Sequence, residues 1–356
     1  MNNSSSPQLS LKPTTTDIVD TLDQAQYNLR ILSLVTYCSA FLLGTASNGL
    51  VIWISSFHLP HSVNRIWFLQ LAVAALAFCF LLPFDVATTA LGYHWPFSRL
   101  GCKLHSTLKS FTLFTSVFLL TLISIDRCVC VLWPVWARGH RSPGQAVLVS
   151  GCAWLLALAL SGPDLVFLDT REEGRMVFCE FNFDPPNNSS DNVVLWLETV
   201  VQRFSDQIIT RFVVGFLVPL IVMGGCYGLI AARLWRGQWS HSRRPFVILI
   251  AWVTIFFLCW FPRHLRFFLE LADAANQVDM NILLIWLDAL ASFLICAHSC
   301  LNPLLYAFLS PDFRKQLFRC LPAILDCGAL GEESESAPSA GNNLDQARPE
   351  TECPEL

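Results

Sequence analysis

Five charged side chains stand in long stretches of the chain that otherwise lack charge: Asp85, Lys109, Arg211, Arg263 and Asp288. An ionised group inside a bilayer is costly unless it is paired or hydrated, so each of these residues is a candidate functional group. Arginine and lysine in such places bind carboxylates and phosphates. Even if Lys109 pairs with Asp85 and Arg263 with Asp288, three cations face two anions. The pattern therefore predicts a cavity that prefers an anion, such as a peptide carboxylate or a fatty-acid-derived mediator.

The elements that would hold these residues are membrane-spanning helices. The chain has 356 residues, of which 54% are hydrophobic and 14% charged, whereas soluble domains carry about 25% charged residues. This composition excludes a disordered chain, a fibrous repeat and an ordinary cytosolic enzyme. Seven apolar stretches approach or exceed the roughly 20 residues that cross a bilayer as a helix. They are Ile31–Phe57, Ile66–Phe84, Leu104–Ile125, Gln145–Pro163, Phe212–Ala232, Pro245–Pro262 and Ile282–Leu309.

The fold class expected is an all-α membrane protein, a bundle of seven transmembrane helices over residues 30–310. A β-barrel would need short alternating segments. Lysine and arginine favour the inner side, with eleven on the inner loops and tail root against seven outside if the N-terminus is outside. Residues 1–29 are then an extracellular, glycosylated segment. Asn-x-Ser sequons support this orientation because they fall on the predicted outer side, at Asn2, Asn3, Asn187 and Asn188.

Two further segments follow the last span. Residues 311–325 predict a short amphipathic eighth helix on the membrane surface, with Phe313, Leu317, Phe318 and Leu321 on its apolar face. Cys320 and Cys327 at its end are candidates for palmitoylation, although plain unmodified cysteines fit the sequence equally well. Residues 326–356 are acidic and expected to be a disordered cytoplasmic tail. Phosphorylation of Ser334 and Ser336 there would create a docking signal.

Short motifs mark three of the spans. Asp126–Cys128 closes the third span, Cys259–Pro262 lies in the sixth, and Asn302–Tyr306 lies near the end of the seventh. Asp126 and Arg127 are expected to form a charge pair at the inner boundary; simple snorkelling of Arg127 to the head groups is the alternative. Pro219, Pro262 and Pro303 each remove a helical hydrogen bond and can form hinges.

On these motifs residues 30–325 resemble the rhodopsin-like G-protein-coupled receptors. The segments Val131–Ala137, Cys226–Ile230 and Ser299–Pro303 sharpen the resemblance to the formyl-peptide receptors and their chemoattractant relatives. The resemblance implies a plasma-membrane receptor that binds a chemoattractant or inflammatory mediator, couples to inhibitory heterotrimeric G proteins and recruits arrestin through its phosphorylated tail. It implies activation switches at Asp126, Arg127, Trp260, Pro262, Asn302, Pro303 and Tyr306.

The resemblance also implies a disulfide between Cys102 and Cys179, which would tie the long outer loop over the mouth of the bundle. The expected ligand-binding residues are Asp85, Lys109, Ser110, Gln207, Arg211, Arg263, His264 and Asp288. Ser110 and Gln207 replace an acidic residue and an arginine of formyl-peptide receptors, which argues against a formylated peptide. Ala75 and His298 replace sodium-site residues of the family, so that the site is expected to be absent.

Other functions fit the sequence less well. A decoy receptor that binds and internalises its ligand without G-protein coupling is the main alternative, and Ala75 favours it. No motif of an intramembrane enzyme is present, and residues 282–309 contain no lysine for a retinal Schiff base. No pattern indicates a metal site, another cofactor or nucleic-acid binding.

Overall fold

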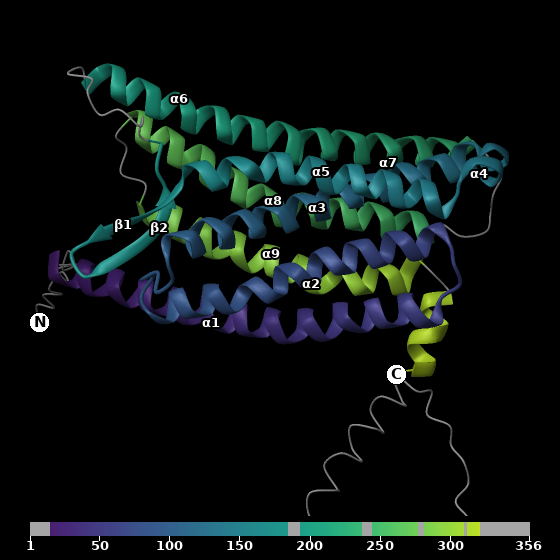
Figure 1. Ribbon diagram of the computed structural model, residues 1–356, viewed down its shortest axis with the longest axis horizontal. Coiled ribbons are helices and arrows are strands. Elements are labelled where there is room, and N and C mark those ends of the chain that lie inside the picture. The colour runs from purple at the N-terminus through teal and green to yellow at the C-terminus, as the bar shows by residue number, and fades with distance from the viewer. Residues whose placement is uncertain (1–14, 184–192, 237–243, 277–280, 310–311, 321–356) are drawn as a thin grey trace, which may run out of the picture.

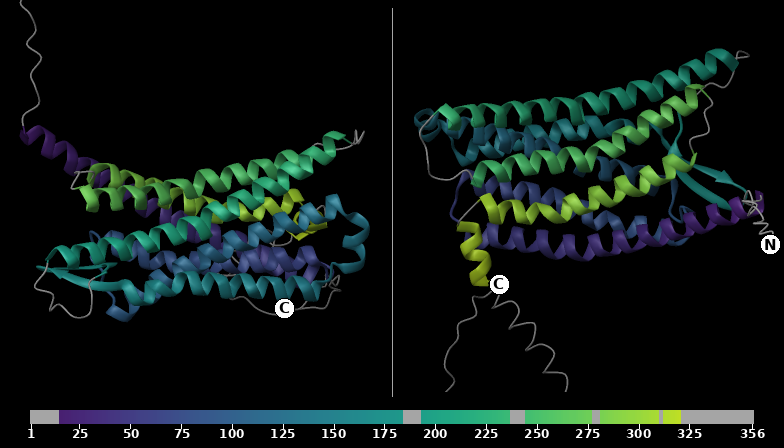
Figure 2. Two further views of the ribbon diagram at one scale, coloured as in Figure 1. Left: turned by 90° about the horizontal axis from the view of Figure 1, so that it is seen from above. Right: turned by 180° about the vertical axis from the view of Figure 1, so that it is seen from behind.

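The computed structural model describes residues 15–183, 193–236, 244–276, 281–309 and 312–320. Long helices run side by side along the molecule (Figure 1, Figure 2). In chain order the elements are α1 Thr15–Trp53, a π-helical turn Ile54–His58, α2 Val63–Ala90, α3 Arg99–Leu132, α4 Pro134–His140, α5 Pro143–Phe167, β1 Leu168–Glu173, β2 Met176–Phe181, α6 Val193–Phe212, a π-helical turn Val213–Leu217, α7 Val218–Arg236, α8 Arg244–Asn276 and α9 Asn281–Leu309.

The chain forms the predicted seven-helix membrane bundle. The turn Val213–Leu217 joins α6 to α7 without a break, so these two form one helix. Within the described residues six helices are long and apolar enough to cross a bilayer. The helix α8 completes the bundle, and its side chains are described over residues 254–273. The helices extend beyond the predicted spans because hydrogen bonding continues into their polar ends.

Serine side chains start three of the helices. Ser62, Ser98 and Ser142 precede α2, α3 and α5, and each accepts a backbone N–H three residues later, at 3.2 to 3.3 Å. Such N-caps satisfy backbone donors that have no partner within the helix. Proline follows Ser142 at the first position of α5, where its missing N–H costs nothing. These local signals fix where the helices begin on both sides of the bundle.

Small and polar residues set the close packing between helices. Gly44 of α1 faces Cys79 of α2, and a Cβ at Gly44 would lie 2.4 Å from the Cys79 sulfur. The Asn48 amide donates to the backbone oxygens of Gly44 at 2.9 Å and Ser299 at 3.2 Å, which ties α1 to α9. Interfaces of this kind replace the hydrophobic driving force that helices lack in lipid.

A two-stranded hairpin lies at one end of the bundle, the end at which α1 begins (Figure 1). Strands β1 and β2 are antiparallel, with Thr170 opposite Cys179. Gly174 begins the turn between them with φ of 62°, a conformation that glycine adopts without strain. The sequence predicts only a long outer loop in this segment, because the two strands are short and partly charged.

A short helix over residues 312–320 runs across the opposite end of the bundle (Figure 1, Figure 2). Phe313 is buried against Phe68 of α2, with ring centroids 6.2 Å apart. Phe318 is exposed, as an apolar membrane contact would be, whereas the thiol residue Cys320 is buried. The predicted sites at Asn2, Asn3, Asn187, Asn188, Cys327, Ser334 and Ser336 and the acidic tail lie outside the described residues.

Candidate ligand-binding site

A cavity of about 560 Å³ occupies the hairpin end of the bundle. Residues of α1, α2, α3, α5, α6, α8 and α9 line it together with both strands of the hairpin, and an aromatic niche continues from it down to Trp260. All eight residues predicted to bind ligand line one of these two spaces: Asp85, Lys109, Ser110, Arg211, Arg263 and Asp288 the cavity, and Gln207 and His264 the niche. Sequence reasoning missed the aromatic lining of Phe181, Phe183, Phe204 and Phe267.

Lys109 of α3 and Asp85 of α2 form an ion pair at one side of the cavity. The ammonium lies 2.7 and 2.8 Å from the two carboxylate oxygens. The imidazole Nε2 of His105 lies 3.8 Å from the same carboxylate, and the Tyr37 ring lies 5.8 Å from the ammonium. Because both charges are largely buried, the pair satisfies groups that would otherwise be costly to hold in the bundle.

Arg211 on the opposite side has a partner that sequence reasoning missed. Its guanidinium donates to Asp164 of α5, and the Gln207 amide donates to the same carboxylate oxygen at 3.2 Å. Arg211 is 8% exposed and Asp164 1%. The predicted fourth span ended at Pro163, one residue too early to count this aspartate. A carboxylate directly after an apolar stretch was the signal that could have revealed it.

The predicted alternative pairing of Arg263 with Asp288 is wrong. Asp288 of α9 lies 3.0 Å from Arg266 Nε, and Arg266 also donates to Glu270 at 2.9 Å, one turn along α8. Which arginine of α8 meets Asp288 depends on how α8 and α9 are rotated and tilted against each other, and spacing along one helix does not reveal this. Among the residues whose side chains are described, Arg263 has no ion pair or hydrogen bond, and its guanidinium lies 5.3 Å from the Phe267 ring.

The expected excess of three cations over two anions also needs correction. Four cations and five carboxylates line the cavity: Lys109, Arg211, Arg263 and Arg266 against Asp85, Asp164, Glu180, Glu270 and Asp288. The carboxylates at Asp85, Asp164, Glu180, Glu270 and Asp288 each lie in an ion pair. The positive charge available to a ligand is therefore local, at Arg263, and does not extend over the whole wall.

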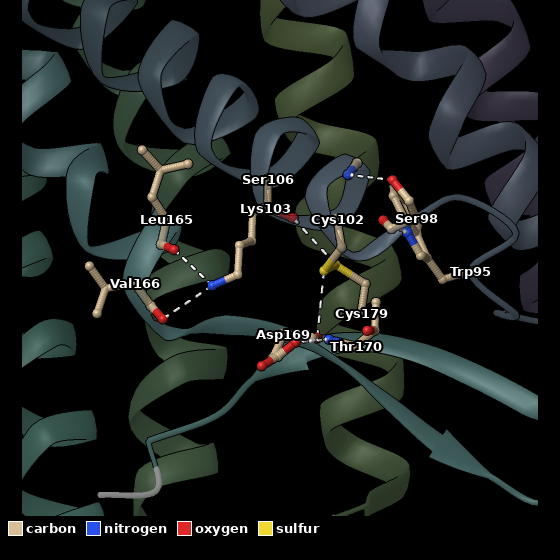
Figure 3. The surroundings of a disulfide bond; sticks show 11 residues. Trp95, Ser98, Cys102, Lys103, Ser106, Leu165, Val166, Asp169, Thr170 and Cys179 are labelled. Carbon is tan, nitrogen blue, oxygen red and sulfur yellow. Dashed lines mark hydrogen bonds between the residues drawn. A yellow bond between two sulfur atoms is a disulfide. The ribbon is translucent and has the colours of Figure 1, made fainter. Parts of the chain in front are cut away.

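The hairpin is fastened to the start of α3 (Figure 3). Cys102 and Cys179 form a disulfide, the Trp95 N–H donates to Val177 at 2.7 Å, and Arg99 lies 2.6 Å from Asp169. Burial raises the pKa of Asp169, but the hydrogen bonds from Arg99 and the Thr170 backbone and the charges of Arg99 and Lys103 together outweigh it, so the pKa lies below its ordinary value. Lys103 donates to the carbonyls of Leu165 and Val166 at the end of α5. These contacts hold β2 against the cavity.

Comparison with known proteins identifies the family. A family described as 7 transmembrane receptor (rhodopsin family) matches residues 47–306, which is more than half of the chain. The chain belongs to this family. Its members are receptors rather than enzymes, and the receptor is a multi-pass membrane protein. The resemblance inferred from the motifs is confirmed.

Individual relatives identify the branch of the family. The receptor is 39% identical to formyl peptide receptor 2 of Mus musculus over 86% of its own chain and 87% of the relative. It is 40% identical to chemerin-like receptor 1 of Homo sapiens over 80% and 77%, and 37% identical to the fMet-Leu-Phe receptor of Oryctolagus cuniculus over 91% and 92%. It lies in the chemoattractant branch that contains these proteins.

At the opposite end of the receptor, the predicted pair of Asp126 with Arg127 is wrong. Asp126 accepts hydrogen bonds from Arg141 at 2.6 and 2.8 Å, while Arg127 donates to the side-chain oxygen of Asn64 at 2.8 Å. Arg141 contacts both carboxylate oxygens of Asp126 in a bidentate arrangement, which is the strong form of this ion pair. Burial lowers the pKa of Arg141, but the bonds to Asp126 outweigh it and raise that pKa above its ordinary value.

The other five predicted switch residues lie on α8 and α9. Trp260 is buried, with ring centroids 5.8 Å from Phe256 and 6.4 Å from His298. Pro262 and Pro303 lie inside α8 and α9, and Asn302 is buried. Tyr306 lies on α9, but its side chain is outside the described residues. Ala75 is 1% exposed in the core of α2. Their roles in activation stay predictions.

Proposed function

We propose that the receptor is a plasma-membrane chemoattractant receptor whose central cavity binds an anionic ligand, a peptide carboxylate or a fatty-acid-derived mediator. The observation that carries the proposal is Arg263, a cation in the cavity wall without a carboxylate partner among the described side chains. An uncompensated cation in a low-dielectric cavity favours a ligand anion strongly. The names of the formyl peptide and chemerin-like relatives support the chemoattractant class.

A ligand anchored at Arg263 would lie close to the Trp260 switch. Trp260 and Arg263 both line the aromatic niche and lie one helical turn apart on α8, with Pro262 between them. Proline weakens the helix locally, so that a push on this turn can move the inner half of α8. Signalling through inhibitory G proteins and recruitment of arrestin remain part of the proposal, supported by the family resemblance.

We place the N-terminus and hairpin outside the cell. Arg127, Arg141 and the basic residues of the helix 312–320 lie toward the opposite end, as the positive-inside rule requires. A disulfide in the hairpin fits an oxidising exterior. The decoy alternative is supported by Ala75 alone. Arg127 and Asn302, two of the residues expected to act in G-protein coupling, are present and argue against it.

The test compares Arg263→Ala with Arg266→Ala in cells that express the full chain. Arg266 lies one turn away and already has two carboxylate partners, which makes it the matched control. G-protein activation is measured against carboxylate ligands and their methyl esters. Arg263→Ala should weaken the response to carboxylates about tenfold or more while sparing the esters. An equal loss for both ligand forms would contradict the anion site.

Coupling is tested separately with Ala75→Asp. If inhibitory G proteins respond in the wild type or in this variant, the receptor function stands. Ligand uptake without a G-protein signal in either form would replace it with the decoy function.

A further inference from the structure

A second cavity, of about 300 Å³, lies between α5 and α6. It is lined by the last turns of α5 and the middle of α6, close to the hairpin end of the bundle. Its walls differ in chemistry. The α5 wall is apolar and consists of Ala159, Leu160, Pro163 and Phe167, whereas the α6 wall is polar and consists of Arg203, Asp206, Gln207, Thr210 and Arg211.

The polar residues form one stripe along α6. Arg203, Gln207 and Arg211 follow one another at intervals of four residues, and Asp206 and Thr210 lie beside them at the same interval. Residues spaced in this way share a face of a helix. Polar side chains on an outward face of a membrane helix need partners, because lipid chains offer none.

The cavity opens toward lipid rather than toward the bundle axis. Around it α5 exposes Leu155 at 68%, Leu158 at 51% and Val166 at 71%, and α6 exposes Ile209 at 47%. In a membrane-spanning bundle such exposed apolar side chains face acyl chains. Material that fills this cavity therefore comes from the bilayer.

The balance of charge in the lining favours a ligand with a neutral head group. Arg211 is compensated by Asp164, and Arg203 and Asp206 cancel in formal charge. Within the described residues Asp206 has no ion pair or hydrogen bond. The polar wall presents the Asp206 carboxylate, which accepts hydrogen bonds, and the Thr210 hydroxyl, which donates and accepts. Hydroxyl groups, which donate and accept, match this set better than a carboxylate does.

We propose that the α5–α6 cavity binds a single-chain lipid with an uncharged, hydroxyl-bearing head group, of the monoacylglycerol type. The acyl chain lies on the apolar α5 wall and the hydroxyls meet the α6 stripe. Gln207 and Arg211 line both this cavity and the spaces of the central site, so the two sites share these side chains. Any effect of bound lipid on the affinity for the central ligand must be matched by an equal effect of that ligand on the affinity for lipid.

The test uses the purified full chain in phosphatidylcholine nanodiscs with a photoreactive monoacylglycerol, whose cross-links are mapped by mass spectrometry. Labelling is expected on residues 155–167 and 203–211, with competition by unlabelled monoacylglycerol but not by the fatty-acid anion. Ala159→Trp should abolish it by filling the cavity. Leu155→Trp, on the same exposed face one turn away and outside the lining, should leave it unchanged.

Thr210→Val provides a variant with almost unchanged shape, in case Ala159→Trp does not fold. Loss of one hydrogen bond should weaken labelling about fivefold. Uniform labelling of all lipid-facing helices, unchanged labelling in folded Ala159→Trp and Thr210→Val, or equal competition by the fatty-acid anion would overturn the proposal. Because labelling needs neither an agonist nor a G protein, its failure is distinct from a failure of the proposed function.

Discussion

The Arg141 guanidinium donates to both carboxylate oxygens of Asp126, at 2.6 and 2.8 Å, across a separation of 15 residues. Arg141 also donates to Asn64 at 2.6 Å, so one amide oxygen is shared with Arg127. The short segment between α3 and α5 is thereby bound to the inner end of α3. The ion-pair partner of Asp126 therefore lies outside the motif Asp126–Cys128. Arg127 is hydrogen-bonded to the neutral amide of Asn64.

This arrangement predicts energetic coupling between Asp126 and Arg141. Arg141→Ala leaves a largely buried carboxylate without its fork and should lower the stability of the purified receptor by about 1–3 kcal/mol. In the Asp126→Asn background the same change should cost far less. Thermal unfolding of the four variants measures the coupling. Additive effects would mean that the contact contributes nothing to stability.

Arg211 and Asp164 should behave as a buried pair. Arg211→Ala leaves the buried Asp164 carboxylate without its ion-pair partner. This change is expected to destabilise the receptor by about 3–5 kcal/mol. Adding Asp164→Asn should recover much of that loss, because an amide is cheaper to bury than a charge. Thermal unfolding in detergent is the measurement. If the double variant is as unstable as Arg211→Ala alone, the loss stems from packing and not from the stranded charge.

Gly44 offers a test of helix packing. In Gly44→Ala the new methyl group would lie 2.4 Å from the Cys79 sulfur, so the Cys79 side chain must rotate or α1 and α2 must move apart, and stability should fall by about 1–3 kcal/mol. Gly49→Ala is the control, since nothing lies within 4 Å of its Cβ position. Combining Gly44→Ala with Cys79→Ala should relieve the clash. Equal stability of the two single variants would contradict the close approach.

The disulfide should matter for ligand binding as well as for stability. Cys102→Ser with Cys179→Ser removes a link that spans 77 residues, at an expected cost of about 2–4 kcal/mol. Because β2 lines the cavity, the loosened hairpin should also weaken the binding of a carboxylate ligand. Saturation binding on intact cells measures this effect. A Cys152→Ser variant serves as the control, as Cys152 is a free, exposed cysteine on α5.

Sequence patterns predicted the bundle well, because each membrane span leaves an unmistakable apolar stretch. The same patterns identified Lys109 with Asp85, since two opposite charges in apolar helices need each other. They failed at Asp164 and Arg266, whose partners depend on helix rotation and tilt. A carboxylate near the end of one helix can pair with any of several cations on its neighbours. Spacing within one helix does not determine which cation becomes the partner. For the same reason the pairing of Asp126 with Arg141 rather than with the adjacent Arg127 could not be predicted.

The tethered hairpin bears on how fast a ligand can dissociate. β2 lies over the central cavity and is fastened to α3 by a covalent bond and by the contacts of Trp95 and Arg99. We expect a ligand bound beneath β2 to dissociate slowly, and differences in dissociation rate account for most differences in affinity between related complexes. The receptor would then stay occupied after the concentration of free ligand has fallen. We therefore expect a cell that carries this receptor to respond to recent ligand concentrations as well as to the present one.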